Sequence, residues 1–239
     1  GSRQVFAQLE QLHADLAPFA QGVRAHVVVH ANTNATNSFL PDDLAEYLQG
    51  HPQVRVSLKE GTSPDVLRAV AAGEAEVGVV AGSLDGNGLE SRPYRQDRLV
   101  LVVPPGHPLS ARARVRFAEV ASQPFVLLHA GSAIHTFMMG IAADLGVTLD
   151  ARIQVRSFEA ILRMVGAGVG LGMVPASAID HHRGPRAFAV VALDEAWAER
   201  NLRICARRFA ELSPHARALV AQLTGESVAG ARDDAPPSP

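Results

Sequence analysis

The chain has 239 residues, of which 47% are hydrophobic and 19% are charged, so we expect a globular fold rather than disorder. No apolar run approaches the roughly 20 residues that a membrane-spanning helix needs, which excludes a transmembrane protein. A net charge of -2 offers no overall attraction to nucleic acid or to a membrane surface. The single cysteine, Cys205, excludes an internal disulfide and a cysteine-based metal cage. It fits a reducing compartment, and we expect a cytoplasmic location.

The N-terminal segment has the apolar spacing of a coiled coil. Within "RQVFAQLEQLHADLAPFAQG" the apolar positions step by four, three, four and three, at Val5, Leu9, Leu12, Leu16 and Phe19. A helix this short is marginal alone in water, so the stripe needs a partner. We expect the same helix of a second chain, with packing against its own domain as the alternative. Residues 1–22 are thus interpreted as a vector remnant, Gly1-Ser2, followed by a dimerisation linker helix.

From residue 25 onward, apolar β-rich runs alternate with amphipathic helical patterns. In the first half the expected strands are 25–31, 54–60 and 75–82, and the expected helices are 40–50 and 63–73. A further strand begins at residue 97 and ends in a proline-rich turn. In the second half the strands are expected at 124–131, 151–157, 170–175 and 202–208, with helices at 134–145, 158–167 and 217–223. Such alternation predicts a mostly parallel sheet, and two similar halves favour two lobes with a cleft between them.

Small polar residues follow the first strand, in the stretch 32–38. In an open parallel sheet, ligands bind beyond the carboxyl ends of the strands, where loops meet helix N-termini. A helix start offers unpaired N–H groups and partial positive charge, and short polar side chains add donors without filling the pocket. The stretch is therefore predicted to form an anion-binding cup that includes Asn32, Thr33, Asn34 and Thr36.

Similar residues occur at three further junctions between a strand and a helix. These are Thr62 with Ser63, Gly131 with Ser132, and Ser157. At any one junction the simpler interpretation is helix capping, for which Ser, Thr and Asn are preferred. For the four junctions together, a ligand site is the favoured interpretation.

Three segments, "HPQVRVSLKEG", "AAGEAEVGVV" and "PPGHPL", resemble the effector-binding domain of LysR-type transcriptional regulators in their order and separation. The resemblance extends over about residues 3–223. It implies an α/β fold of two Rossmann-like lobes, periplasmic-binding-protein-like (type 2), with an N-terminal linker helix. Lobe I would hold residues 23–97 and 208–224, lobe II residues 98–207, and residues 225–239 would form a disordered tail.

The resemblance also implies a function, that of the ligand-sensing and oligomerisation half of a bacterial transcription factor. A small anionic or polar effector would bind between the lobes, without cofactor or metal. DNA would be bound only through an N-terminal winged helix-turn-helix that this sequence lacks. The effector site would comprise Asn32, Thr33, Asn34, Thr36, Thr62, Ser63, Ala81, Gly82, Gly131, Ser132, Ser157 and Phe158. A homodimer or homotetramer would form through the helices "PDDLAEYLQG" and "IHTFMMGIAADLG".

Two other classes of function were weighed against this one. An enzyme is disfavoured because the nearby Ser132 and His135 lack a Gly-x-Ser-x-Gly elbow, and because "HH" at 181–182 has no second pair of metal ligands at suitable spacing. The glycine-rich segment 166–172 trails a helix rather than opening one, so it does not predict a dinucleotide site. A solute-binding protein of a transport system would share the fold, and it remains the alternative. Of the 21 arginines, we expect one at most to reach the cleft.

Overall fold

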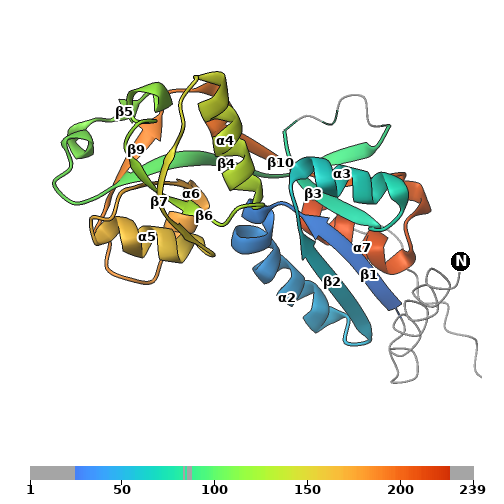
Figure 1. Cartoon of the computed structure of the whole chain (residues 1–239). Coiled ribbons are helices and arrows are strands. Elements are labelled where there is room, and N and C mark those ends of the chain that lie inside the picture. Colours follow the sequence, from blue (N-terminus) through green and yellow to red (C-terminus); the bar gives the residue numbers. More distant parts are fainter. Residues whose placement is uncertain (1–24, 83, 85–87, 227–239) are drawn as a thin grey trace, which may run out of the picture.

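The computed structural model describes residues 25–82, 84 and 88–226. Two α/β lobes lie side by side and are joined by two long strands, β4 (Glu90–Val103) and β10 (Glu199–Ala206) (Figure 1). The predicted linker helix at 1–22 and nearly all of the predicted tail fall outside the described residues. No helix in the described part of the chain is long and apolar enough to cross a membrane.

Lobe I is built on a mixed sheet with the strand order β2-β1-β3-β10-β4. Strand β1 (Ala25–Ala31) lies parallel to β2 (Val54–Glu60) and to β3 (Val77–Ala81). Strand β10 then pairs antiparallel with β3 and with β4. The apolar side chains Val27, Val29 and Ala31 of β1 are fully buried, which is why this strand lies inside the sheet.

Helices cover both faces of this sheet. On one face α2 (Leu40–Gly50) and α7 (Pro214–Thr224) pack on β1, β3 and β10 through a core that includes Leu44, Tyr47 and Leu219. On the other face α3 (Ser63–Ala72) packs through Val66 and Val70 against a smaller cluster.

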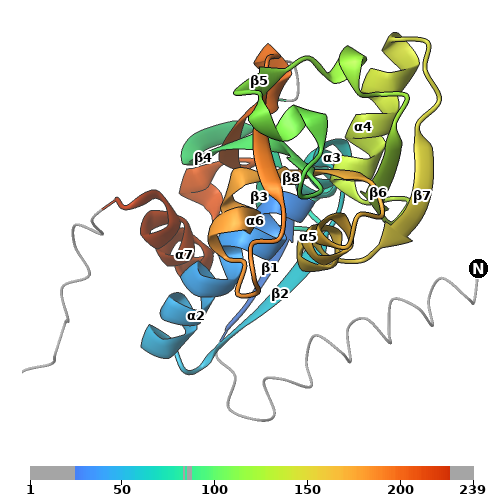
Figure 2. The same cartoon turned by 90° about the vertical axis from the view of Figure 1, so that its left-hand side faces the viewer.

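Lobe II continues the sheet from the second half of β4, in the order β4-β8-β6-β7. Its strands are β5 (Arg114–Val115), β6 (Pro124–Leu128), β7 (Asp150–Val155), β8 (Leu171–Pro175) and β9 (Ala189–Leu193), with helices α4 (Ala133–Asp144), α5 (Phe158–Gly166) and α6 (Ala176–Asp180). Strand β9 pairs with β4 and β5. In Figure 2, α4 lies above β6 and β8 and α5 lies below them. One large apolar cluster joins these layers.

Short 3-10 segments connect several of these elements. They are η3 (Pro108–Ala111), η4 (Phe117–Glu119), η5 (Ala196–Ala198) and η6 (Phe209–Glu211). Segment η5 leads directly into β10, the second crossing strand, and η6 leads into α7.

The strands and helices predicted from apolar periodicity between residues 25 and 223 are present, with bounds that differ by a few residues. The largest difference is β4, which begins at Glu90 rather than near residue 97, because its charged and Pro93-containing first half is an edge of lobe I. The sequence did not predict β5, β9 or α6, which are two to five residues long and give little periodicity.

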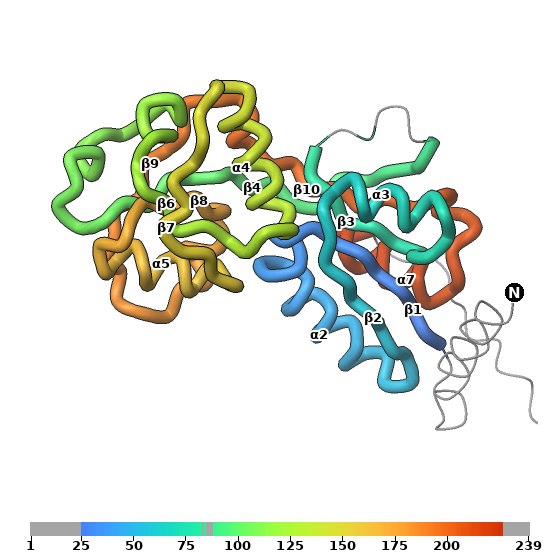
Figure 3. Tube along the Cα trace, in the orientation of Figure 1, coloured from blue at the N-terminus to red at the C-terminus, as the bar shows by residue number. Residues whose placement is uncertain are grey.

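The crossing strands differ from the predicted division of lobes in one respect. Strand β4 pairs with β10 through Arg98, and it pairs with β8 from Leu99 and with β9 from Val100. Strand β10, however, lies within the predicted segment 98–207 of lobe II but pairs with β3 of lobe I. The length of an apolar run does not reveal which strand it pairs with. A lobe boundary placed after β10 was therefore equally consistent with the apolar pattern of the sequence. Figure 3 shows β4 and β10 running from one lobe to the other.

We expect Gly78→Ala to destabilise lobe I. A Cβ at Gly78 of β3 would lie 2.6 Å from Cys205 Sγ and 2.9 Å from methyl carbons of Val66 and Val70, so α3 must shift away from the sheet. Overpacking of this kind costs about 1–3 kcal/mol of unfolding free energy. Urea denaturation measures the loss. The matched control is Gly50→Ala, where the added methyl meets nothing within 4 Å; equal losses for the two variants would contradict the expectation.

Candidate functional site

The predicted cup after β1 is the first turn of a helix rather than a loop. Helical backbone begins at Thr33 and continues through a short π-helix, η2 (Ala35–Phe39), into α2. The Asn32 side-chain oxygen accepts the Ala35 N–H at 2.9 Å, and the Asn32 carbonyl accepts the Thr36 N–H at 3.0 Å. Asn32 is buried and acts as the cap of this helix start. Segments of π-helix frequently occur at functional sites.

Thr33 connects the two lobes directly. Its hydroxyl donates to Glu60 Oε1 at 2.9 Å, at the end of β2 in lobe I. The same oxygen accepts the N–H of Ala133 at 3.1 Å, at the first turn of α4 in lobe II. Thr33 is only 3% exposed, so its bond to Ala133 lies in a largely desolvated contact between the lobes, whereas Glu60 is exposed.

Asn34 takes part in a second contact between the lobes. Its Nδ2 donates to Asp97 Oδ2 at 3.0 Å, and Ser177 Oγ donates to the same carboxylate oxygen at 2.6 Å. Ser177 N also donates to Asp97 Oδ1 at 3.3 Å. Asn34 belongs to lobe I, Asp97 to the crossing strand β4, and Ser177 to α6 of lobe II.

A small cleft lies between the lobes at these contacts. It is lined by Asn32, Thr33, Asn34, Leu99, Ala133, Ile134, Phe137, Phe158, Pro175 and Arg200. The cavity volume is about 20 Å³, which is room for about one water molecule. Because a small-molecule site normally has a volume of several hundred Å³, a ligand requires the side chains or the lobes to move apart.

Arg200 is the one charged residue in the lining of this cleft. Its guanidinium lies over the Phe137 ring, 4.5 Å from the centroid, and burial lowers the pKa of the group. Among the described residues, no carboxylate forms an ion pair with it. The sequence allowed for one arginine in the cleft but could not single out this one, because the predicted strand began at residue 202 and Arg200 lies among the consecutive polar residues before it. Because arginine stays protonated in proteins, Arg200 carries its positive charge in the cleft.

Several predicted site residues instead support a neighbouring helix of lobe I. Thr62 caps α3 by accepting the Asp65 N–H at 3.3 Å, and Ser63 Oγ accepts the Ala81 N–H at 3.1 Å. Strand β3 ends at Ala81, and Gly82 follows it. None of Thr62, Ser63, Ala81 and Gly82 lines the cleft. Their proposed contact with an effector stays a prediction.

Of the predicted site residues in lobe II, two cap helices, one lies in a turn and one lines the cleft. Ser132 and Ser157 accept the His135 and Ala160 N–H groups at 3.3 and 3.2 Å, and so cap α4 and α5. Gly131 supplies a positive φ of 90° at the turn before α4. Phe158 does line the cleft. The structure therefore brings Asn32, Thr33, Asn34 and Phe158 together, while Thr36 keeps a buried hydroxyl without a partner among the described residues.

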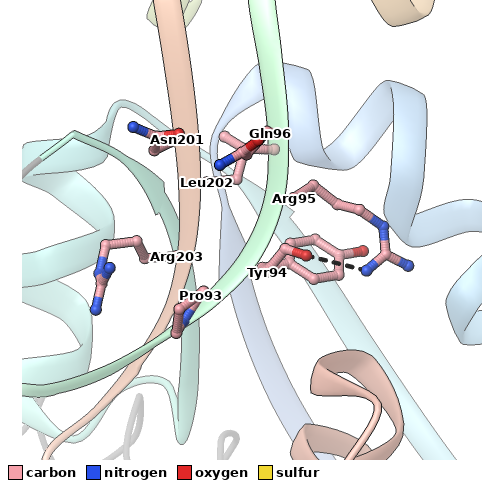
Figure 4. A pocket seen from close by; sticks show the side chains of 7 residues that line it. All are labelled: Pro93, Tyr94, Arg95, Gln96, Asn201, Leu202 and Arg203. Carbon is pink, nitrogen blue, oxygen red and sulfur yellow. Dashed lines mark hydrogen bonds between the residues drawn. The ribbon is translucent and has the colours of Figure 1, made fainter.

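A second hollow, of about 320 Å³, lies on the crossing strands. It is lined by Pro93, Tyr94, Arg95, Gln96, Asn201, Leu202 and Arg203, at the irregular register between Leu202 and Arg203 (Figure 4). Figure 4 shows Asn201 and Arg203 on one side of the two strands and Tyr94 and Arg95 on the other. Arg95 is already paired with Asp43 at 3.0 Å. These side chains do not converge on a common point, so we attribute the hollow to the bulge rather than to a ligand.

The two-lobed fold with crossing strands is shared with solved regulatory domains. The regulatory domain of CcmR from Synechocystis PCC6803, in complex with 2-PG, has a TM-score of 0.70 at 19% identity and covers 84% of this chain and 97% of that chain. The effector-binding domain of BenM with its effector benzoate has a TM-score of 0.63 at 22% identity and covers 85% of this chain and 92% of that chain. The predicted fold, periplasmic-binding-protein-like of type 2, is confirmed.

Sequence comparison identifies the family. The model of the LysR substrate binding domain matches residues 20–227, so the chain belongs to that family. A probable RuBisCO transcriptional regulator of Trieres chinensis is 23% identical over 81% of this chain and 65% of its own length. The regulator CysL of Bacillus subtilis is 21% identical over 74% of this chain and 60% of its own length. The chain thus spans less than two thirds of these relatives, whose names describe transcriptional regulators rather than enzymes.

We expect Thr33→Val and Thr36→Val to differ in sign although they lie one helical turn apart. The first leaves the Ala133 N–H without its acceptor in a buried contact, which costs about 1–3 kcal/mol of unfolding free energy. The second replaces a hydroxyl that has no partner by an isosteric methyl group, which is neutral or stabilising. Chemical denaturation of both variants measures the difference. A stable Thr33→Val, or a Thr36→Val as damaged as Thr33→Val, would refute this account of the cup.

Proposed function

We propose that this domain senses a small anionic effector between its lobes and controls DNA binding by another segment of a LysR-type regulator. The observation that carries the proposal is Arg200, a guanidinium in the cleft that forms no ion pair with any carboxylate of residues 25–82, 84 and 88–226. A partly buried charge lacking a counter-ion is costly, and a bound acid group supplies both the opposite charge and charge-assisted hydrogen bonds. The start of α4, at Ala133, adds partial positive charge at the same place.

The rest of the cleft favours an effector with an apolar body. The apolar side chains that line it belong to the hinge and to lobe II. They are Leu99, Ile134, Phe137, Phe158 and Pro175. Aromatic and aliphatic walls with a few polar groups at one end are typical of sites for small organic ligands. The effector class proposed is therefore a small organic acid rather than an inorganic anion.

Similar structures support a small acid. BenM is described with its effector benzoate, and the effector-binding domain of QuiR is described in complex with shikimate. Both of those ligands are small carboxylates. At 22% and 14% identity, these structures share only the fold with this chain. The proposed effector class therefore rests on the residues of this chain.

The chain's one cysteine argues against a thiol-based signal. Cys205 is fully buried in β10, and burial raises the pKa of its thiol to about 12. Thiolate, the reactive form, is therefore scarce near neutral pH, and oxidants do not reach it. A regulatory response through ligand binding is the better account.

Regulation would work by a shift between lobe arrangements. An effector changes the balance only to the extent that it binds one arrangement more tightly than the other. Pairing of the chains into a homodimer or homotetramer through α2 and α4 would pass this change to the DNA-binding segments. In α4, Met139 and the adjoining Leu145 are 40% and 44% exposed, which suits a surface that pairs, whereas Met138 is buried in the core.

We expect Arg200→Gln to abolish the response to acids. A thermal-shift screen of small carboxylates, with benzoate and shikimate included, should raise the unfolding midpoint of the wild-type domain. Removing one partner of a partly buried charge pair costs about 30-fold or more in affinity, so the shift should disappear in the variant. Arg98→Gln, an exposed arginine on the neighbouring strand, is the matched control and should respond like the wild type. A full response by Arg200→Gln would sink the proposal.

Met139→Glu is expected to weaken self-association. A buried glutamate at a paired apolar surface is costly, so the dissociation constant should rise by about tenfold or more. Sedimentation velocity over a range of concentrations measures it. Val190→Glu, at a similarly exposed valine on β9, serves as the control and should leave association unchanged. A wild-type chain that stays monomeric at high concentration would contradict pairing altogether.

A further inference from the structure

The carboxylate of Asp97 is saturated by donors from both lobes. Oδ2 accepts Asn34 Nδ2 at 3.0 Å and Ser177 Oγ at 2.6 Å, while Oδ1 accepts Ser177 N at 3.3 Å and Arg98 N at 2.8 Å. A carboxylate has about four acceptor positions, so none remains for a ligand. Asp97 stands where β4 passes from lobe I to lobe II. We propose that Asp97 is a positioning residue that latches the lobes together and thereby keeps Arg200 available in the cleft.

The latch joins three separate parts of the chain. Asn34 comes from the helix start after β1, Asp97 from the crossing strand, and Ser177 from α6, so the three groups meet only when the lobes are in contact. Ser177 is 8% exposed, which means that its bonds are shielded from water. Hydrogen bonds to a charged group are stronger than neutral ones, and they weaken if either lobe moves away.

Arg200 is the alternative partner of Asp97. The two residues are directly opposite in the antiparallel pairing of β10 with β4, and directly opposed side chains lie on one face of a sheet. They form no ion pair in this arrangement, because Asp97 faces Asn34 and Ser177 while Arg200 lies over Phe137. If the lobes part, Asp97 loses the donors from Asn34 and Ser177, and the Arg200 guanidinium is the cation placed to replace them.

This exchange of partners gives the hinge two states. With the lobes latched, Arg200 has no carboxylate partner among the described residues, and an acid can pair with it once the side chains that line the cleft make room. With the lobes apart, Asp97 neutralises it. The importance of this exchange for an effector rests on the proposed function, but the latch itself does not. It follows that the latch is testable without any ligand, and that its failure and the failure of effector sensing are separate results.

Amide hydrogen exchange of the ligand-free domain tests the latch. The reporter is the Ala133 N–H, which bonds across the lobes to Thr33 and does not touch Asp97. In Asp97→Asn and in Ser177→Ala we expect exchange at Ala133 to accelerate by about tenfold or more, because loss of a charge-assisted bond raises the population of parted lobes. Acceleration at Ser177 alone would mean a purely local role and would overturn the latch, as would equal acceleration throughout both lobe cores. Asp194→Asn, which removes an exposed ion pair with Arg114 inside lobe II, is the matched control and should leave Ala133 unchanged.

The exchange of partners has its own test in Arg200→Gln. Without the guanidinium, Asp97 has no replacement cation when the lobes part, so opening becomes rarer and exchange at Ala133 should slow severalfold relative to the wild type. The same substitution in the Asp97→Asn background should have no such effect, since no carboxylate is left to pair. Unchanged or faster exchange at Ala133 in the single variant would rule out the alternative pairing.

Discussion

The antiparallel pairing of β4 with β10 is the constraint on which the rest of the molecule depends. These two strands belong to the sheet of lobe I at one end, and β4 continues into the sheet of lobe II at the other. Because opposed side chains in an antiparallel pair share a face, the register that sets Arg200 against Asp97 also directs both residues toward the space between the lobes. A shift of β10 by one residue would turn Arg200 to the opposite face while Asp97 kept its own. The chemistry of the cleft is therefore fixed by backbone hydrogen bonds at the hinge.

Polar groups at this interface mostly satisfy one another. Thr33 links Glu60 to the start of α4, and Asp97 collects donors from Asn34 and Ser177. Buried polar groups are stable only when paired, so these bonds allow the lobes to approach until the cavity is about 20 Å³. A guest that binds with the lobes latched has to displace the apolar side chains that line this cavity. Its binding energy must exceed the cost of that displacement, and the surplus alone shifts the balance between arrangements.

The apolar pattern of the sequence was sufficient to predict most of the fold. Three predicted elements coincide with β1, β2 and α2, because their apolar pattern is regular. They are the strands 25–31 and 54–60 and the helix 40–50. The first half of β4 was missed because Pro93 and its charged neighbours suppress the strand signal at an edge.

The site was harder to predict. A polar residue after a strand can cap a helix or contact a ligand, and Ser132, Ser157 and Thr62 are caps in the structure by the same local chemistry that made them candidates.

Arg200 and Asp97 show why sequence alone could not identify the centre of the cleft. Both lie in strands rather than in the loops where ligand contacts were sought, and they are far apart in the chain, so only the pairing register brings them together. The different roles of Asp97 and Arg200 also have a physical origin. Asp97 can satisfy its carboxylate with neutral donors from Asn34 and Ser177, whereas a guanidinium has only donors and needs acceptors or an aromatic face, which Phe137 provides in part. Since a cation over an aromatic ring is stabilised less than one bonded to a carboxylate, Arg200 is the group in the cleft that gains most from a bound acid. In the proposed function, this imbalance between a saturated anion at the hinge and an under-satisfied cation in the cleft is the basis for choosing an acidic effector.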